Sequence, residues 1–585
     1  MNWGSNMKHE IDDALKLKVM SHLSVIYPHE NIDVLASKLI QLMRLDEDII
    51  KANSHGNRWN ENDVWMITYG DSIHSPDRVP LQSLSKFMHR HLSGLINGVH
   101  ILPFFPYSSD DGFSVINFAQ VNESLGSWQD IESISQDFHL MGDLVVNHCS
   151  SRSIWFENYK QCKHPGKDYF VTVDDDFDIS NVVRPRTSPL LREVETFEGK
   201  KKVWCTFSHD QVDLNYENPD LLWEMIKTIK LYLDYGVRIF RLDAVAFLWK
   251  ESGTSSIHLK QTHEMVRLFR TLIEHHSEDA IIITETNVPN AENLSYLGNA
   301  NEAHAVYNFS LPPLLLQTLI SGNCQYLKQW LVTMPPSQMG TFYFNFIASH
   351  DGIGLRPAEG LLEQSEINEL ANCMKDFGGR ISWRTSDDGQ DKPYEINITL
   401  FDALQGTTKG PDRWQIARFL CAHGVMLALE GVPAIYIHSF LATQNYYQGV
   451  EHTNHNRTIN RYKWDEDALE ALLKEDNHHS TVFSEMKKLV SIRRAETSFH
   501  PNAEQFVLHI NDELFGFWRQ SIDRSEKIFC IYNISDQQQQ LDLTCLNLPY
   551  DGEWVDLVQA KKYPNIYETI SLEPYQFIWL KNKQS

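Results

Sequence analysis

Hydrophobic positions along this chain follow two patterns that alternate over most of its length. Short, almost entirely apolar runs rich in β-branched and aromatic residues are separated by longer segments in which apolar residues recur every three or four positions. The short runs are typical of parallel strands buried on both faces, and the longer segments are typical of amphipathic helices. Eight short runs occur, at 63–71, 98–106, 142–148, 236–245, 280–287, 303–309, 341–351 and 433–439. This alternation predicts an α/β protein built on a closed parallel (β/α)8 barrel, or TIM barrel.

Four regions depart from the strand–helix alternation. Residues 1–62 carry two polar helical patterns ahead of the first predicted strand, which indicate an N-terminal helical segment. The stretches at 151–216 and 352–411 are too long for one connecting helix, so we expect loop-inserted subdomains after the third and seventh strands. Runs that alternate apolar and polar residues predict a C-terminal antiparallel β domain at 498–585. The barrel is assigned to the remaining residues, 63–150 and 217–497.

Composition and charge exclude several classes of protein. The 585 residues include 52 Lys and Arg against 77 Asp and Glu, a net charge of −25, which repels phosphate backbones and anionic lipids. We therefore expect no nucleic-acid partner and no membrane anchor. The eight cysteines form no CxxC pair, the first residues lack the apolar core of a signal peptide, and no window resembles a spanning helix. These features favour a cytoplasmic globular protein.

Charged and polar side chains accumulate where several of the predicted strands end. A single aspartate in such a place is usually a cap or turn residue, but barrel enzymes use the C-terminal ends of their strands for catalysis. Carboxylates, histidines and an arginine that converge on one barrel mouth suit chemistry in which positive charge develops on a sugar ring. These residues are Asp143, Asn147 and His148 after the third strand, Arg241 and Asp243 after the fourth, Glu285 after the fifth, and His350 and Asp351 after the seventh.

Reaction at a glycosidic bond requires one ionised and one protonated carboxyl group. Arg241 lies two residues before Asp243, so both side chains face the same side of the strand and the guanidinium favours the anionic carboxylate that a nucleophile needs. Glu285 follows an apolar run and has no obvious cationic neighbour, which favours a protonated acid/base. Asp351 would bind sugar hydroxyls and favour the transition state. On neighbouring strands the first two carboxyl groups would lie about 5–5.5 Å apart, as in a retaining double displacement.

Four segments resemble, in order, the signature stretches of the α-amylase superfamily: GDLVVNH (142–148), GVRIFRLDAV (236–245), IITETN (282–287) and FIASHD (346–351). The resemblance extends over about residues 60–460 and the β tail. It implies a retaining α-glycoside enzyme in which Asp243 is the nucleophile, Glu285 the general acid/base and Asp351 the transition-state stabiliser. It also implies that Arg241, His148 and His350 contact the donor sugar.

Further segments resemble the sucrose phosphorylase subfamily. PFFPYSSDDGFS (103–114) is similar to the segment that holds the donor sugar and stacks on it, which maps to Asp110 and Phe113. NHNRTINR (454–461) is similar to the motif whose first arginine, here Arg457, contacts the donor glucose. Members transfer a glucosyl group reversibly from an α-glucoside to inorganic phosphate, so these two small molecules are the expected partners, with no cofactor. Three more segments resemble the arginine-bearing loop, the seventh-strand motif and the mobile acceptor loop of the subfamily: VVRPRTSPLL (182–191), SHDGIG (349–354) and PYEIN (393–397).

Phosphate must compete with water for the covalent intermediate, which calls for cationic or hydrogen-bond-donating groups in this acidic protein. Arg186 is one candidate, because a guanidinium group can bind phosphate with two hydrogen bonds, and Tyr394 of PYEIN is another. Glu395 of the same loop is a further candidate for substrate contact. The alternative is that Arg184 and Arg186 only brace a charged loop.

Two positions depart from the pattern of well-known sucrose phosphorylases. Phe247 replaces a tyrosine four residues after the nucleophile, and Asn287 replaces a histidine two residues after the acid/base. Both positions face the acceptor or phosphate in the subfamily, so the loss of a hydroxyl and an imidazole should alter which leaving group is bound. The segments ETNVP and PYEIN resemble more closely the branch that uses glucosylglycerate or glucosylglycerol. Fructose and phosphorylated sugars stay open as leaving groups.

Two other functions also stay open. An α-glucosidase or sucrose hydrolase on the same scaffold would pass the intermediate to water, whereas a non-catalytic barrel would only bind sugar. The second is disfavoured because all three carboxylates are present. Asn147 matches a calcium ligand of many amylases, but the sucrose phosphorylase subfamily generally lacks that ion and we expect no bound metal. Dimers are common in this subfamily, and the sequence leaves the oligomeric state open.

Overall fold

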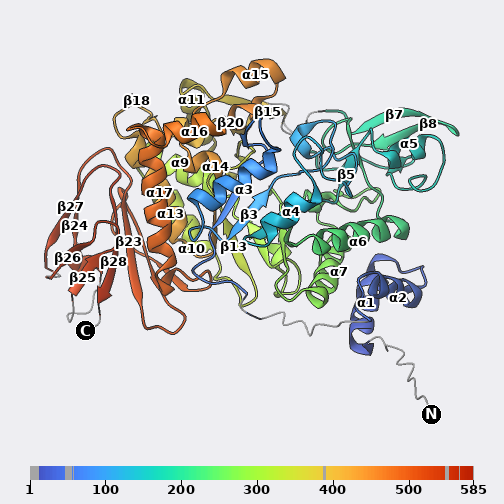
Figure 1. The fold of residues 1–585 in the computed structure, drawn as a ribbon, viewed down its shortest axis with the longest axis horizontal. Helices are drawn as coiled ribbons and strands as arrows, with labels where there is room; N and C mark the ends of the chain where they lie inside the picture. The colour runs from blue at the N-terminus through green and yellow to red at the C-terminus, as the bar shows by residue number, and fades with distance from the viewer. Residues whose placement is uncertain are drawn as a thin grey trace, which may run out of the picture. The chain divides into compact units, whose positions relative to one another are not determined.

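A computed structural model describes residues 12–46, 56, 58–186, 188–385, 391–546, 553–564 and 567–583. Its central element is a closed barrel of eight parallel strands, which confirms the predicted fold class (Figure 1). Each of the eight predicted apolar runs overlaps one barrel strand. In their order around the barrel the strands are β1 (Trp65–Thr68), β19 (Val432–Tyr436), β13 (Phe342–Asn345), β12 (Ala305–Tyr307), β11 (Ile281–Thr284), β10 (Val237–Asp243), β4 (His139–Val145) and β3 (Gly98–Ile101).

The chain divides into two compact units, each described by itself. The first unit consists of residues 1–56, 101–286 and 294–306, and it carries β4, β10 and β11. The second unit consists of residues 57–100, 287–293 and 307–585, and it carries β1, β13 and β19. Residues 498–585, for which the sequence predicts a separate β domain, therefore belong to the larger second unit. Within the described residues, no helix combines the length and apolar character needed to cross a membrane.

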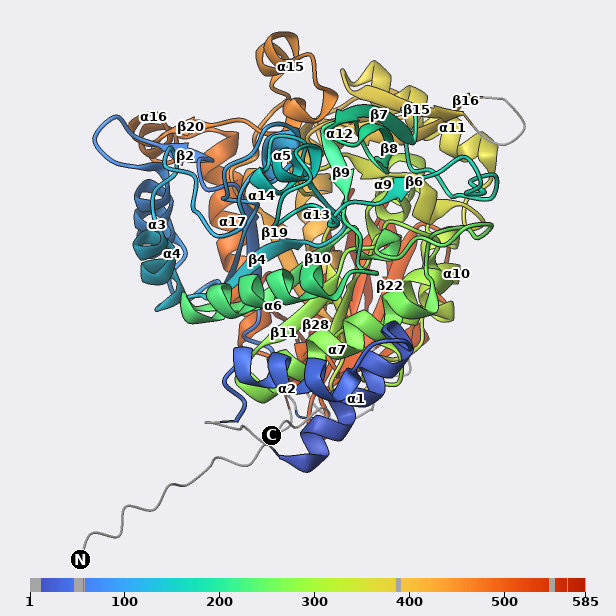
Figure 2. The same ribbon diagram turned by 90° about the vertical axis from the view of Figure 1, so that its right-hand side faces the viewer.

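Two N-terminal helices of the first unit cover helices of the barrel layer. Helix α1 (Asp13–Ile26) packs on α7 (Lys260–His276), and α2 (Ile32–Leu42) packs on α6 (Pro219–Asp234), as Figure 2 shows. These helices correspond to the two polar helical patterns of the segment 1–62, of which residues 1–11, 47–55 and 57 lie outside the described residues. The side chain of Asp12 caps α1 by accepting a hydrogen bond from the amide of Ala14, as expected at a helix N-terminus.

The segment inserted after β4 returns to the barrel through a pair of short antiparallel strands. Strand β5 (His148–Ser150) pairs with β9 (Gln211–Asp213), so the start and the end of the insertion lie side by side. Between them are helix α5 (Ile154–Lys160) and a small sheet with a core of its own. The sheet has the strand order β6 (Thr172–Val173), β8 (Gly199–Trp204), β7 (Leu191–Thr196), and its core contains Val171, Val173, Leu190 and Trp204.

In the second unit, the segment after β13 forms a three-stranded antiparallel sheet. Its strand order is β14 (Ile353–Gly354), β16 (Asp391–Asn397), β15 (Arg380–Thr385), and helix α11 (Gln364–Asp376) lies between β14 and β15 along the chain. Strand β16 contains the predicted acceptor segment PYEIN. A short 3-10 helix, η5 (Asn456–Asn460), contains Arg457 and packs against β16.

The C-terminal residues of the second unit form a six-stranded sheet that packs on helix α13 (Gln415–Ala428). Gly424 permits close approach here, because a Cβ atom at this position would lie 2.7 Å from the ring of Phe577. The hydroxyl of Tyr532 donates a hydrogen bond to the carbonyl of Gly424 at 2.9 Å. The sheet runs in the order β21 (Glu504–Val507), β22 (Leu514–Gln520), β23 (Lys527–Asn533), β28 (Phe577–Lys583), β25 (Glu553–Asp556), β26 (Lys561–Tyr563).

Candidate active site

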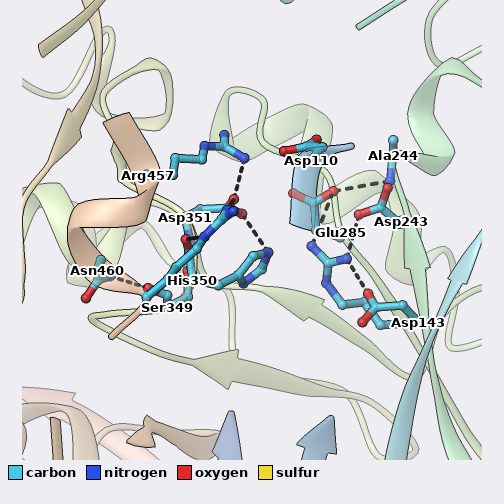
Figure 3. A network of polar contacts seen from close by, with 12 residues as sticks. Asp110, Asp143, Asp243, Ala244, Glu285, Ser349, His350, Asp351, Arg457 and Asn460 are labelled. Carbon is cyan, nitrogen blue, oxygen red and sulfur yellow. Dashed lines mark hydrogen bonds and ion pairs between the residues drawn. The ribbon is translucent and has the colours of Figure 1, made fainter. Parts of the chain in front are cut away.

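Arg241 is the centre of a group of three carboxylates in the first unit. Its Nη1 atom lies 2.5 Å from Asp143 Oδ1 and 2.5 Å from Asp243 Oδ1, and its Nη2 atom lies 3.8 Å from Glu285 Oε2 (Figure 3). The pairing of β4 with β10 sets Asp143 directly beside Arg241. The pairing of β10 with β11 sets Thr284, the residue before Glu285, beside the residue that follows Arg241. The register of three neighbouring strands therefore brings one guanidinium to three acids.

The carboxylate of Glu285 has one cationic neighbour on β10 and one hydrogen-bond donor just after that strand. Besides Arg241, the backbone N–H of Ala244 donates to Glu285 Oε2 at 3.2 Å. Ala244 has φ 52°, in the left-handed region that non-glycine residues rarely occupy, and such strain is found at functional sites. The expectation that Glu285 lacks a cationic neighbour is therefore wrong. Its side chain is 14% exposed, so a ligand can reach it although most of its surface is covered.

The ion pair expected between Arg241 and Asp243 is present, but it does not dominate the pKa of the aspartate. Burial raises the pKa of Asp243 above the usual value, and the charges of Arg241 and His148 oppose this shift without cancelling it. The nearby carboxylate of Asp143 adds to the rise. A carboxylate held by an arginine yet poorly solvated is a stronger nucleophile than one in water.

The predicted donor-sugar segment packs against the same strands. Phe113 is buried, and the guanidinium carbon of Arg241 lies 5.4 Å from the centre of its ring. His148 Nε2 lies 3.1 Å from the carbonyl oxygen of Phe113 and 3.3 Å from Gln211 Nε2. The amide of Gln211 also donates to Asp110 Oδ2 at 3.2 Å. Gln211 thus joins the two predicted donor contacts Asp110 and His148, a role that no local sequence pattern indicates.

Two further predicted residues of the first unit are more distant from this group. The ring of Phe247 makes an edge contact with Phe207 at 5.6 Å, and Phe207 in turn lies 5.2 Å from the ring of His148. Arg186 is partly exposed in the loop between β6 and β7, so its role at phosphate stays a prediction. The side chain of Arg184 in the same loop donates to the carbonyl of Ser188, which is the bracing role considered for this pair.

An internal ammonium group lies where the sequence resembles a calcium ligand. Lys250 Nζ donates to Asn147 Oδ1 at 2.7 Å and lies 2.6 Å from Asp213 Oδ2. The amide of Asn147 donates to the same aspartate oxygen at 3.0 Å, and Thr206 donates to Asp213 through its amide and its hydroxyl. Burial lowers the pKa of Lys250, and the charge of Asp213 opposes this. Lys250, which follows β10, thus links Asn147 in the β4–β5 turn to Asp213 on β9.

Replacing Lys250 by methionine should destabilise the protein because it leaves the carboxylate of Asp213 buried without a cation. We expect the free energy of unfolding to fall by about 3–5 kcal/mol, which chemical denaturation followed by circular dichroism would measure. Lys227→Met is the matched control, since its exposed ion pair with Glu224 contributes little. A chelator should leave the wild-type transition unchanged. An unchanged transition for the Lys250 variant would contradict this account.

The second unit contains a separate group of charged residues around Asp351. Arg457 Nη1 lies 2.5 Å from Asp351 Oδ1 (Figure 3). The same guanidinium binds Glu395 through Nε at 3.0 Å and Nη2 at 2.6 Å. His350 Nε2 lies 3.4 Å from Asp351 Oδ2. The side chain of Glu395 is 3% exposed, whereas that of Asp351 is 24% exposed. Glu395 therefore orients Arg457, and Asp351 is the acid that a ligand can reach.

Two residues that the sequence analysis did not assign support the loop of Asp351. Arg461 Nε donates to the carbonyl of His350 at 2.9 Å, and Asn460 Nδ2 donates to the carbonyl of Ser349 at 2.5 Å. Both follow Arg457 in the segment NHNRTINR, so this segment holds the loop by its backbone as well as by its charge. An arginine four residues after Arg457 is the only local signal in the sequence.

Asn287 and Tyr394, predicted to face the acceptor or phosphate, also belong to the second unit. Asn287 lies against Gly354, where an added Cβ atom would approach Asn287 Nδ2 to 3.0 Å. Asn287 also lines a small cavity together with Asp351. The carbonyl of Tyr394 accepts a hydrogen bond from the amide of Leu355 at 3.0 Å, which fixes the backbone of β16 beside the Asp351 loop. The contacts of both residues with substrate stay predictions.

Comparisons with known proteins agree on one family. The model of the α-amylase catalytic domain matches residues 92–352, and that of the maltogenic amylase C-terminal domain matches residues 505–579. A glucosylglycerate phosphorylase of Spirochaeta thermophila is 45% identical over 82% of this chain and 82% of its own length. The corresponding enzyme of Escherichia coli is 40% identical over 97% of this chain and 100% of its own. The crystal structure of sucrose 6F-phosphate phosphorylase from Thermoanaerobacter thermosaccharolyticum matches with a TM-score of 0.70 and 25% identity, covering 81% of this chain and 94% of that one.

Proposed function

This chain belongs to the family of glucosylglycerate and sucrose phosphorylases with an α-amylase-type barrel, and we propose that it transfers the glucosyl group of glucosylglycerate to inorganic phosphate. The products are α-glucose 1-phosphate and glycerate. The observation that carries the proposal is the end-to-end match with a glucosylglycerate phosphorylase. The presence of Asp243, Glu285 and Asp351 in this chain agrees with it. The enzyme is then a hexosyltransferase that retains the configuration of the anomeric carbon.

The first half of the proposed reaction forms a covalent glucosyl–enzyme. Asp243 attacks the anomeric carbon, and the bond from that carbon to the glycerate oxygen breaks. Glu285 gives its proton to the departing oxygen, so that glycerate leaves as an alcohol. The position of Arg241 supports these roles, because its charge favours the anionic form of Asp243 against the effect of burial and lies close enough to stabilise Glu285 once it has lost its proton.

The second half returns the enzyme to its starting state. An oxygen of phosphate attacks the anomeric carbon, the bond to Asp243 breaks, and Glu285 accepts the proton of the attacking oxygen. Two inversions give net retention. We propose that Asp351 binds the sugar hydroxyls while positive charge develops on the ring, and that Arg457 orients it, as the short contact between these two residues supports.

The leaving group and the incoming nucleophile of this reaction are both anions. Glycerate carries a carboxylate and phosphate carries up to two negative charges, so one set of cationic or hydroxyl groups can serve both in turn. We propose Arg186 and Tyr394 for this role, because a guanidinium pairs with carboxylate and phosphate alike. With Phe247 and Asn287, this chain lacks the tyrosine hydroxyl and the histidine imidazole that well-known sucrose phosphorylases have at these positions. Their absence agrees with a leaving group that is smaller than fructose and charged.

A donor screen with and without phosphate tests this function. The purified protein is incubated with glucosylglycerate, glucosylglycerol, sucrose or sucrose 6′-phosphate, and α-glucose 1-phosphate and free glucose are measured. We expect the ester to form from glucosylglycerate only when phosphate is present, and more slowly from the other donors. Equal release of free glucose in both conditions, without any ester, would show a hydrolase instead. No reaction with glucosylglycerate but rapid reaction with another donor would correct the leaving group.

A further inference from the structure

The segment that carries Asp110 and Phe113 is held in an unfavourable backbone conformation. Asp110 has φ 54° and Asp111 has φ 45°, two consecutive non-glycine residues in the left-handed region, and Gly112 follows with φ 117°. A Cβ atom at Gly112 would lie 2.8 Å from the carbonyl oxygen of Pro103. Each left-handed residue costs of the order of 1 kcal/mol, so the surrounding structure must stabilise this turn.

A single carboxylate accepts three of the side-chain hydrogen bonds that hold the turn. Asp210 Oδ2 accepts hydrogen bonds from the hydroxyls of Ser108 and Ser109 at 2.5 Å each and from that of Ser114 at 2.9 Å. Its other oxygen accepts one from Ser151 at 2.7 Å. Three of the four donors belong to the segment 108–114, and they lie on both sides of the strained residues. The carboxylate therefore closes this segment into a loop.

The backbone around Asp210 anchors this carboxylate to the first unit. The amide of Ser151 donates to the carbonyl of Asp210 at 2.8 Å, and the hydroxyl of Ser114 shares its one proton between this carbonyl, at 3.0 Å, and Oδ2. The next residue, Gln211, begins β9 and donates to Asp110 Oδ2. Partial burial tends to raise the pKa of Asp210, but the four serine hydroxyls outweigh it and the pKa lies below the usual value. The group is thus an anion at neutral pH.

We propose that Asp210 is a positioning residue for the glucosyl subsite, holding the 108–114 loop in the strained conformation that presents Asp110 and Phe113 to the donor sugar. This inference rests on the proposed function, because Asp110 and Phe113 contact a donor sugar only if the chain acts as the sucrose phosphorylase-like segment 103–114 implies. It explains why a charged acceptor lies among neutral donors: a charged acceptor strengthens each hydrogen bond, and the three such bonds from the segment 108–114 can offset the strain of the turn.

Asp210→Asn tests the inference, since it keeps the size of the side chain and removes its charge and one acceptor oxygen. We expect KM for glucosylglycerate to rise about tenfold or more, with a smaller change in kcat. The KM for α-glucose 1-phosphate in the reverse reaction should rise by a similar factor, because both donors occupy the glucosyl subsite. The KM for glycerate should stay within about twofold of the wild type. A purely structural defect would not separate the donor from the acceptor in this way.

Matched variants keep the test decisive. Asp178→Asn removes the charge of an exposed aspartate in the same inserted segment, whose carboxylate accepts a hydrogen bond from the amide of Ser180. The kcat and all KM values of this variant should match those of the wild type. If the Asp210 variant does not fold, Ser108→Ala with Ser109→Ala removes two of the donors and should raise the donor KM in the same way. Adding Asp111→Gly to the Asp210 variant should recover part of the loss, because glycine adopts positive φ without strain.

The outcomes separate this inference from the proposed function. If the wild type forms no α-glucose 1-phosphate from any of the donors, the proposed function fails. If the wild type is active and the Asp210 variant keeps its donor KM, or loses donor and acceptor affinity equally, the positioning role is overturned while the function stands.

Discussion

Replacing Asp243 by asparagine should lower kcat/KM for glucosylglycerate by about 10⁴-fold or more, which corresponds to about 5.5 kcal/mol of transition-state stabilisation. The substitution removes the atom that we propose to bond to the anomeric carbon and leaves the shape of the site unchanged. Stability should hardly change. Arg241 keeps Asp143 as a partner at 2.5 Å, and burial already raises the pKa of Asp243, so removing its charge also removes a desolvation cost.

Asp143→Asn is the matched control for this experiment. Asp143 binds the same guanidinium nitrogen as Asp243, but its side chain is fully buried, so it cannot reach a ligand. We expect this variant to lose stability while keeping measurable activity, the reverse of the Asp243 variant. Thermal unfolding and initial-rate assays on both proteins would measure the contrast. More than about 1% residual kcat/KM in the Asp243 variant would contradict its assignment as the nucleophile.

A second measurement identifies the chemical step that Asp243 performs. Asp243→Ala leaves space on the face of the sugar from which the nucleophile attacks, and a small anion such as azide can enter it. With α-glucosyl fluoride as the donor, the alanine variant should form β-glucosyl azide, because one displacement inverts the anomeric carbon. An α-configured azide product would mean that a different residue forms the covalent bond.

The barrel was predictable because its signal is local. A parallel strand covered on both faces must be apolar at nearly every position, so the eight runs could be found without knowing which strands are neighbours. The pairing of Arg241 with Asp243 was equally predictable, since side chains two residues apart on a strand point to the same face. The C-terminal sheet was found from its alternating pattern for the same reason.

The charges around Glu285 and Arg457 were not predictable, because they depend on pairings between distant segments. The contact of Arg241 with Glu285 follows from the register of β10 and β11, and its contact with Asp143 follows from the register of β10 and β4. Glu395 and Arg457 were each expected to contact substrate, but they bind each other across 62 residues of sequence. A sequence identifies such residues as polar and unusual without indicating their partners.

Lys250 and Asp210 show the same limit in residues that do not touch substrate. Lys250 lies seven residues after Asp243, beyond the end of the strand, and its partner Asp213 comes from the inserted segment. Asp210 accepts hydrogen bonds from serines about one hundred positions earlier in the chain. In the sequence these serines resemble those of an ordinary polar loop. Both carry a buried or partly buried charge whose partners are set by the fold of the chain. Their roles can be recognised only once the contacts of the segment inserted after β4 are known.

Replacing Glu285 should affect the reaction in a way that depends on the leaving group. The Glu285→Gln variant cannot donate a proton, so the release of glycerate, whose alcohol oxygen is a poor leaving group, should slow by about 10³–10⁴-fold. Fluoride needs no proton to depart, and α-glucosyl fluoride should therefore form the glucosyl–enzyme at a rate within about tenfold of the wild type. Comparing kcat/KM for the two donors measures this difference, because kcat/KM reports the first displacement.

The contacts of Glu285 make this contrast sharper than a loss of charge alone would. Its Oε2 atom accepts the N–H of Ala244 and faces Arg241, so a glutamine can keep the hydrogen bond from Ala244 through its carbonyl oxygen. The remaining amide group then faces the substrate as a donor without a transferable proton, and the position of Asp243 is undisturbed. Equal losses for both donors would show that Glu285 acts on Arg241 and Asp243 rather than on the leaving group. A selective loss, restored by a donor that needs no acid, is the behaviour expected of the proton donor itself.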